Sequence, residues 1–156
     1  MIRRFAPVLL ALGLCACTSG ASLETRWPAH PDDAAILEER IDRRLSESLD
    51  ALGALSLALE TSAHPEEALA AATRATAAAA ALRALAQART AMAGIGADGQ
   101  RALLFAAAAA ACHEGVAKIG PRIGAEDGRL APATALRRAQ VACLACQTLR
   151  VLPVAG

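Results

Sequence analysis

Residues 36–60, ILEERIDRRLSESLDALGALSLALE, decide the fold class of this 156-residue chain. Leucine and isoleucine recur there every three or four residues, which places them along one face of an α-helix. These apolar positions are Leu37, Ile41, Leu45, Leu49, Leu52, Leu55 and Leu59. Charged residues such as Asp50 fall on the other faces. The stretch therefore predicts a long amphipathic helix from about Asp32 to Thr61.

Proline and glycine divide the following sequence into three more helical segments. His64-Pro65-Glu66-Glu67 opens the second helix, with proline at the first helical position and acids in the first turn. This helix is expected to run to Gly94, before the glycine-rich break at residues 94–99. We expect a third helix over about residues 100–119 and a fourth from Pro132 to about residue 152. The short connections predict an antiparallel four-helix bundle.

The composition also favours an all-α protein. Aromatic residues make up 2% of the chain and tyrosine is absent, whereas alanine, the strongest helix former, is abundant. Small alanine side chains should let the helix axes approach closely. The alanine runs at residues 77–81 and 106–111 have charged residues nearby, so we expect packed helices there and no membrane span. The net charge of +1 argues against nucleic-acid binding.

No enzyme motif is found in its proper context, so no catalytic activity is predicted. Residues 94–99 have the Gly-x-Gly-x-x-Gly spacing of phosphate-binding loops, but they follow a predicted helix and no strand precedes them. Neither a His-Glu-x-x-His sequence nor a serine-nucleophile motif occurs.

The first residues resemble a bacterial lipoprotein signal. Arg3 and Arg4 precede an apolar stretch, residues 5–14, that is too short to span a bilayer. Leu14-Cys15-Ala16-Cys17 then resembles a lipobox, with Cys17 as the residue that is acylated and becomes the new N-terminus. The expected organisation is therefore a signal peptide at 1–16, a lipidated tether at 17–31 and a bundle at 32–156.

This signal implies a protein held on a membrane through the lipid on Cys17. Thr18 follows the cysteine in place of the aspartate that marks inner-membrane retention in enteric bacteria. In a Gram-negative host this favours the outer membrane, with the bundle facing the periplasm. An ordinary secretory signal is the alternative, and it also places the protein outside the cytoplasm.

The last predicted helix contains Cys143-Leu-Ala-Cys146-Gln147, a c-type haem attachment motif in which glutamine replaces histidine. Cys143 and Cys146 are three residues apart, so both thiols lie on one helix face, which Gln147 and Arg150 continue. Residues 142–150 resemble the corresponding segment of the cytochrome c′ family, including its six-coordinate members. Those proteins are four-helix bundles of similar length with Cys-x-x-Cys-His, and then an arginine, in their last helix. The arginine-rich residues 39–44 also look like that family's opening helix.

The resemblance implies haem c attached at Cys143 and Cys146, with Arg150 near a propionate. Gln147 would then be a weak iron ligand, and Ile41 stands where six-coordinate members carry a methionine ligand. The implied function is binding of a diatomic gas or weak electron transfer. Members of the family often dimerise, so a homodimer is also implied.

Without haem, the chain would be a structural or interaction lipoprotein in which the two thiols form a disulfide or bind metal. A Cys143–Cys146 disulfide would leave Cys112 unpaired. Cys112 and His113 also offer Zn or Cu(I) ligands, but adjacent helical residues point about 100° apart. A hairpin centred near residue 125 would leave His113 about 9 Å short of Cys143 along the helix axis. His30 and His64 are expected to be surface residues.

Overall fold

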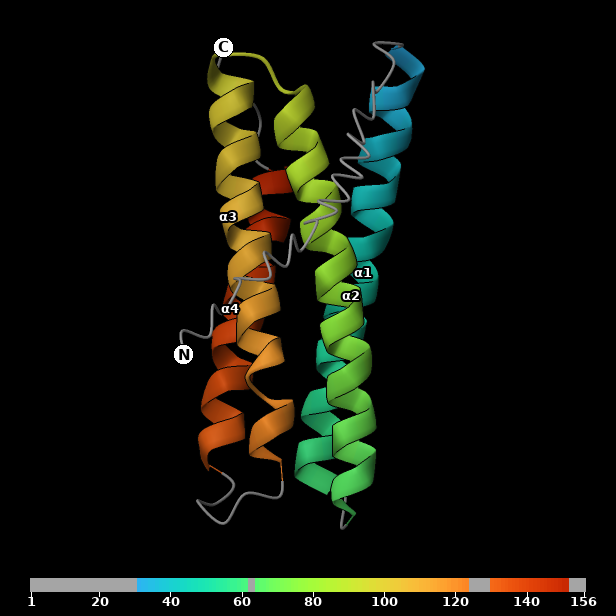
Figure 1. The fold of residues 1–156 in the computed structure, drawn as a ribbon, viewed down its shortest axis with the longest axis vertical. Coiled ribbons are helices and arrows are strands. Elements are labelled where there is room, and N and C mark those ends of the chain that lie inside the picture. Colours follow the sequence, from blue (N-terminus) through green and yellow to red (C-terminus); the bar gives the residue numbers. More distant parts are fainter. Residues whose placement is uncertain (1–30, 62–63, 124–129, 152–156) are drawn as a thin grey trace, which may run out of the picture.

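Four antiparallel α-helices form the fold, which confirms the predicted all-α architecture (Figure 1). The computed structural model describes residues 31–61, 64–123 and 130–151. The helices are α1 Pro31–Thr61, α2 Pro65–Met92, α3 Ala97–Ala117 and α4 Leu130–Val151, with a 3₁₀ turn, η1 Gly120–Arg122, after α3. The predicted signal peptide and the tether up to residue 30 lie outside the described residues.

Two helices begin earlier than the sequence analysis placed them. Helix α3 begins at Ala97 and includes Gly99. Residue 99 has to be glycine, because a Cβ atom there would collide with the carbonyl oxygen of Gly94. Glycine here lets the first turn of α3 lie against the preceding loop. Helix α4 begins two residues before Pro132. Proline is tolerated there because the amides of a first helical turn have no partner within the helix.

The interior consists of two adjoining groups of buried side chains. One contains Cys112 and Cys143 with aliphatic residues of all four helices, and the other contains Cys146 around Phe105. The main buried positions of α2 are alanines, namely Ala68, Ala71, Ala72, Ala75, Ala79 and Ala86. Close packing of helix axes is seen where α3 meets α4, because a Cβ atom on Gly115 would lie 3.0 Å from the Cβ of Ala139.

Residues 97–122, α3 with its following turn, are long and apolar enough to cross a membrane by length and composition. The argument that the second alanine run lacks the length and hydrophobicity of a membrane span was therefore wrong, since the run adds to flanking leucine, isoleucine and valine. In the structure this helix packs against α2 and α4. Its buried positions, among them Phe105, Cys112 and Val116, face the interior of the bundle.

Candidate functional site: the buried cysteines

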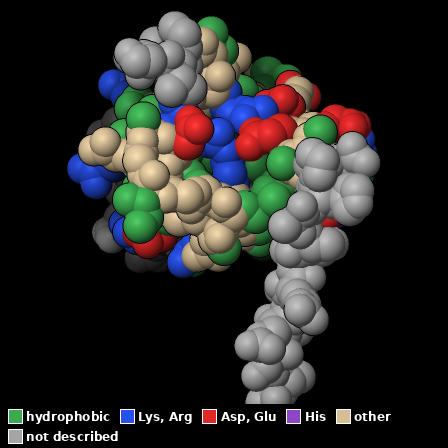
Figure 2. Space-filling model, turned by 90° about the horizontal axis from the view of Figure 1, so that it is seen from above, with side chains coloured by type: hydrophobic (Ala, Val, Ile, Leu, Met, Phe, Trp, Pro, Cys, Tyr) green, Lys and Arg blue, Asp and Glu red, His purple; other side chains and the backbone are tan. Residues whose placement is uncertain are grey.

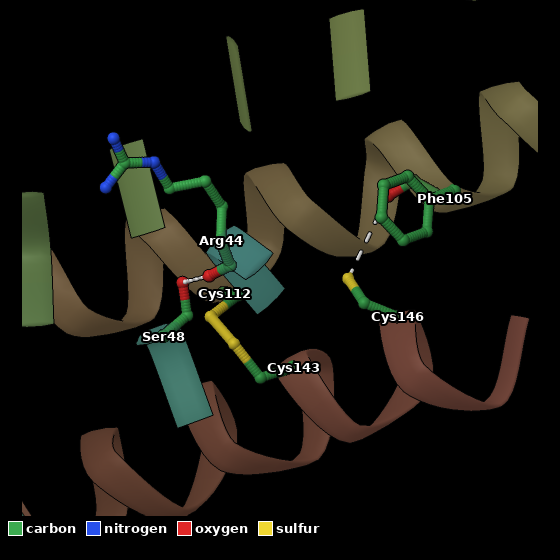
Figure 3. The surroundings of a disulfide bond; sticks show 6 residues. All are labelled: Arg44, Ser48, Phe105, Cys112, Cys143 and Cys146. Carbon is green, nitrogen blue, oxygen red and sulfur yellow. Dashed lines mark hydrogen bonds between the residues drawn. A yellow bond between two sulfur atoms is a disulfide. The ribbon is translucent and has the colours of Figure 1, made fainter. Parts of the chain in front are cut away.

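A disulfide joins Cys112 of α3 to Cys143 of α4 (Figure 3). Both residues are fully buried, and their Cα atoms are 5.4 Å apart, within the usual range for a disulfide. The expected disulfide between Cys143 and Cys146 is therefore wrong, and so is the expectation that Cys112 stays unpaired. The facing helix brings the Cys112 sulfur level with Cys143, whereas Cys146 lies almost one turn further along α4.

This pairing also corrects the predicted register of the α3–α4 hairpin. The midpoint between the bonded cysteines falls between residues 127 and 128, and not near residue 125. The contact of Gly115 with Ala139 gives nearly the same midpoint. The reason is that η1 prolongs the connection after α3, so that α4 returns further along the chain than a simple hairpin would.

Cys146 is the free cysteine of the described part of the chain, and it is buried. Its thiol points toward the backbone carbonyl of Phe105, with 4.0 Å between sulfur and oxygen (Figure 3). Burial raises the pKa of the Cys146 thiol to about 11, against the smaller lowering effect of its backbone hydrogen bond. The group is therefore a protonated thiol at neutral pH, and it packs as a small apolar side chain.

Ser48 of α1 lies beside the disulfide (Figure 3). Only 1% of its surface is exposed, and its hydroxyl donates a 2.7 Å hydrogen bond to the backbone carbonyl of Arg44, one turn earlier. Its donor is thus satisfied within α1. The buried side chains packed around the disulfide are otherwise apolar, and within the described part of the chain none of them is charged.

The structure separates the other two motif residues from the thiols. Gln147 is exposed to solvent. Arg150 reaches across to α1, where its Nε donates a 2.7 Å hydrogen bond to Asp42 and its Nη1 pairs with Glu38. Burial lowers the pKa of Arg150, but the hydrogen bond to Asp42 and the charge of Glu38 outweigh this effect and raise it overall.

A second arginine joins this ion-pair group. Arg89 of α2 donates a 2.7 Å hydrogen bond from Nε to Glu38, and its guanidinium carbon lies 5.9 Å from the centre of the Phe105 ring. Glu38 thus forms ion pairs with both arginines, and these pairs link α2 and α4 to α1. Neither Glu38 nor Arg89 was predicted from the sequence as a site residue. The spacing of Glu38 and Asp42, four residues apart on one helix face, was the available signal.

The described residues do not fit a haem at the Cys-x-x-Cys motif. The Cys143 sulfur that would carry one thioether is bonded to Cys112, and Cys146 is fully buried. The fully buried Phe105 and Ile41 pack in the same group as Cys146, in the space where a macrocycle would have to lie. Leu103 and Leu104 do not contribute to this filling, since they are exposed.

The metal candidates are not gathered into a site either. His113 lies with its Nδ1 3.4 Å from an Arg83 guanidinium nitrogen, in contact with α2. Cys112, its neighbour in sequence, is occupied by the disulfide. Over residues 31–61, 64–123 and 130–151, no three Cys, His, Asp or Glu side chains come close enough together to hold a metal ion.

The comparisons with known proteins returned no relative. No family model, no curated protein and no solved structure matches this chain.

Proposed function

We propose that this chain is a haem-free, lipid-anchored helical bundle that faces the periplasm and acts as a structural or interaction protein. The observation that carries the proposal is the disulfide between Cys112 and Cys143. It uses one of the two thiols of the Cys-x-x-Cys motif to link α3 to α4. The motif then serves the packing of the bundle and not the attachment of a cofactor.

The chemistry of the thiols agrees with an exported protein. Disulfides persist in oxidising compartments such as the bacterial periplasm and are rare in the cytoplasm. The disulfide is therefore consistent with the export signal predicted from residues 1–17. Cys146, being protonated and fully buried, offers no reactive thiolate for redox catalysis.

The first experiment asks whether haem is present. Residues 18–156 are secreted into the periplasm of a bacterium that carries the c-type cytochrome maturation machinery, and absorption and intact mass are measured. We expect a colourless protein, lighter than the bare polypeptide by the two hydrogens of one disulfide. Peptide mapping should link Cys112 to Cys143 and find Cys146 alkylated only after unfolding. A Soret band with the added mass of one haem would overturn the proposal.

Two variants test separately the two features that disfavour haem, which are the Cys112–Cys143 bond and the packing of Phe105 and Ile41. Gln147→His restores the attachment motif, and we expect it to remain colourless because Cys143 stays bonded to Cys112. Combining it with Cys112→Ala frees Cys143, and we expect no haem in this variant either, since Phe105 and Ile41 still fill the space. Covalent haem in Gln147→His alone would contradict the proposal.

The anchor is tested by a matched pair of substitutions in the full-length chain. Cys17→Ser should abolish incorporation of labelled fatty acid and release the protein from the membrane fraction. Cys15→Ser should leave both unchanged, because acylation at Cys15 would put the bulky Leu14 directly before the cleavage point. Sucrose-gradient separation of the two membranes then tests the outer-membrane location. Equal lipidation of the Cys17→Ser variant and the wild-type chain would refute the anchor.

A further inference from the structure

Apolar side chains are exposed at the end of the bundle where α1 and α3 begin and α2 and α4 end. Ile95, in the loop between α2 and α3, is fully exposed, Val151 is 77% exposed and Leu103 is 59% exposed. Figure 2 looks down on this end, and it shows arginine and acidic side chains near the centre with hydrophobic side chains beside them. Ile95 and Leu103 line the same surface hollow, and adjoining exposed apolar side chains of this kind often mark a surface that another molecule covers.

The loop that carries Ile95 is held in place by its own contacts. The amide of Ala93 donates a 2.9 Å hydrogen bond to the carbonyl of Arg89, and the amide of Gln100 donates one of 3.0 Å to Gly96. Gly96 has φ of 136°, a conformation that favours glycine. Ile95 is therefore presented at the tip of a loop fixed at both ends.

The predicted tether leads to this same end of the bundle, since α1 begins there at Pro31. The chain from Cys17 to Pro31 comprises fourteen residue steps, which span at most about 50 Å when fully extended. Helix α1, with 31 residues, is about 46 Å long at 1.5 Å per residue. The opposite end would thus reach the membrane only with the whole tether stretched along the bundle.

We propose that the end of the bundle around Ile95 rests on the lipid surface, with Ile95 and Leu103 in contact with the membrane. The proposal rests on the lipid anchor at Cys17 proposed above. The Ile95 end exposes Asp98 in the first turn of α3. The opposite end fits a lipid surface less well, because it exposes more charged side chains, namely Glu60, Glu66, Lys118 and Arg122.

The contact is apolar in character. The charges at the centre of the Ile95 end belong to two arginines and two acids that pair with one another, namely Arg89, Arg150, Glu38 and Asp42. This group has no net charge, and the exposed Asp98 in the first turn of α3 adds one acid at the same end, so the described charges there give no preference for anionic lipid. We therefore expect the same contact on vesicles of pure phosphatidylcholine as on vesicles that contain phosphatidylglycerol.

The test uses the lipidated, full mature chain in vesicles, with an environment-sensitive NBD dye attached at Leu103→Cys. Cys146 does not interfere, because it is buried and its thiol is protonated. A second protein carries the dye at Leu69→Cys, which is 49% exposed on the first turns of α2 at the opposite end. Vesicle flotation, the dye emission wavelength and the rate of dye reduction by external dithionite are recorded.

We expect both proteins to float, and the dye at position 103 alone to show a blue-shifted emission and slower reduction. Adding Ile95→Ser should abolish this protection without loss of flotation, whereas Leu57→Ser, at an exposed position near the opposite end, should not. A chain that floats but shows equal reduction at both positions overturns this inference and leaves the anchor intact. A chain that does not float overturns the anchor and, with it, the contact. Protection of position 103 that needs no vesicles and grows with protein concentration means self-association and overturns the lipid contact.

Discussion

The Cys112–Cys143 disulfide should supply a large share of the stability of the bundle. Reduction removes this link without removing a sulfur atom, so it isolates the effect of the bond. The cysteines are 31 residues apart in sequence. For a loop of this length the chain-entropy relation gives about 3.7 kcal/mol at 25 °C. This is a substantial part of the roughly 5–15 kcal/mol by which domains are usually stable.

The assay is urea unfolding of residues 18–156, followed by circular dichroism with and without dithiothreitol. With a urea dependence of about 2 kcal/mol per M, the reductant should lower the unfolding midpoint by about 2 M. The Cys112→Ala/Cys143→Ala variant should unfold at low urea in both conditions. Cys146→Ala, which removes one buried sulfur, should cost only about 1 kcal/mol and remain sensitive to reductant. Equal midpoints for the wild-type chain with and without reductant would mean that the disulfide adds nothing to the stability of the bundle.

Three further predictions concern single residues. Replacing Arg150, whose side chain is 16% exposed and paired with two acids, by methionine should lower the unfolding free energy by about 1–2 kcal/mol. The same change at Arg43, whose pair is mostly exposed, should cost under about 0.5 kcal/mol; equal losses would contradict this. Gly115→Ala should destabilise because its Cβ would press on α4, whereas Gly53→Ala, with open space around it, should stabilise by about 0.5–1 kcal/mol; thermal melts of both variants decide it. Folding raises the pKa of Cys146 from 9.0 to about 11. The stabilisation of the folded state by the buried, protonated thiol is therefore complete below pH 9 and is lost as the pH rises through about 11. The wild-type chain should therefore lose more stability over this range than Cys146→Ala does, and parallel pH profiles would rule out the effect.

Helix number and order could be predicted because they depend on local signals. The apolar period in residues 36–60 and the Pro65 start gave α1 and α2 nearly at their observed bounds. The starts of α3 and α4 were less accurate. Gly99 was taken as part of a break, although it is needed inside α3 where the loop comes close.

The candidate site was harder to predict because it depends on contacts between helices. Cys143 and Cys146 are three residues apart in sequence, so the local pattern suggested that they act together. Their partners instead come from α3, where Cys112 bonds Cys143 and the Phe105 carbonyl lies near the Cys146 thiol. Side-chain pairing across a bundle follows from the register of neighbouring helices, which the sequence of one helix does not specify.

Local signals in the sequence specify the secondary structure and the fold class, because helix propensity, apolar periodicity and proline and glycine positions act over a few residues. The sequence also supplies the cysteines and the charges. Which of these side chains meet depends on the tertiary structure. The α3–α4 register paired Cys112 with Cys143, and the approach of α4 to α1 placed Arg150 against Glu38 and Asp42. Both outcomes depend on how whole helices fit together when their buried faces leave water.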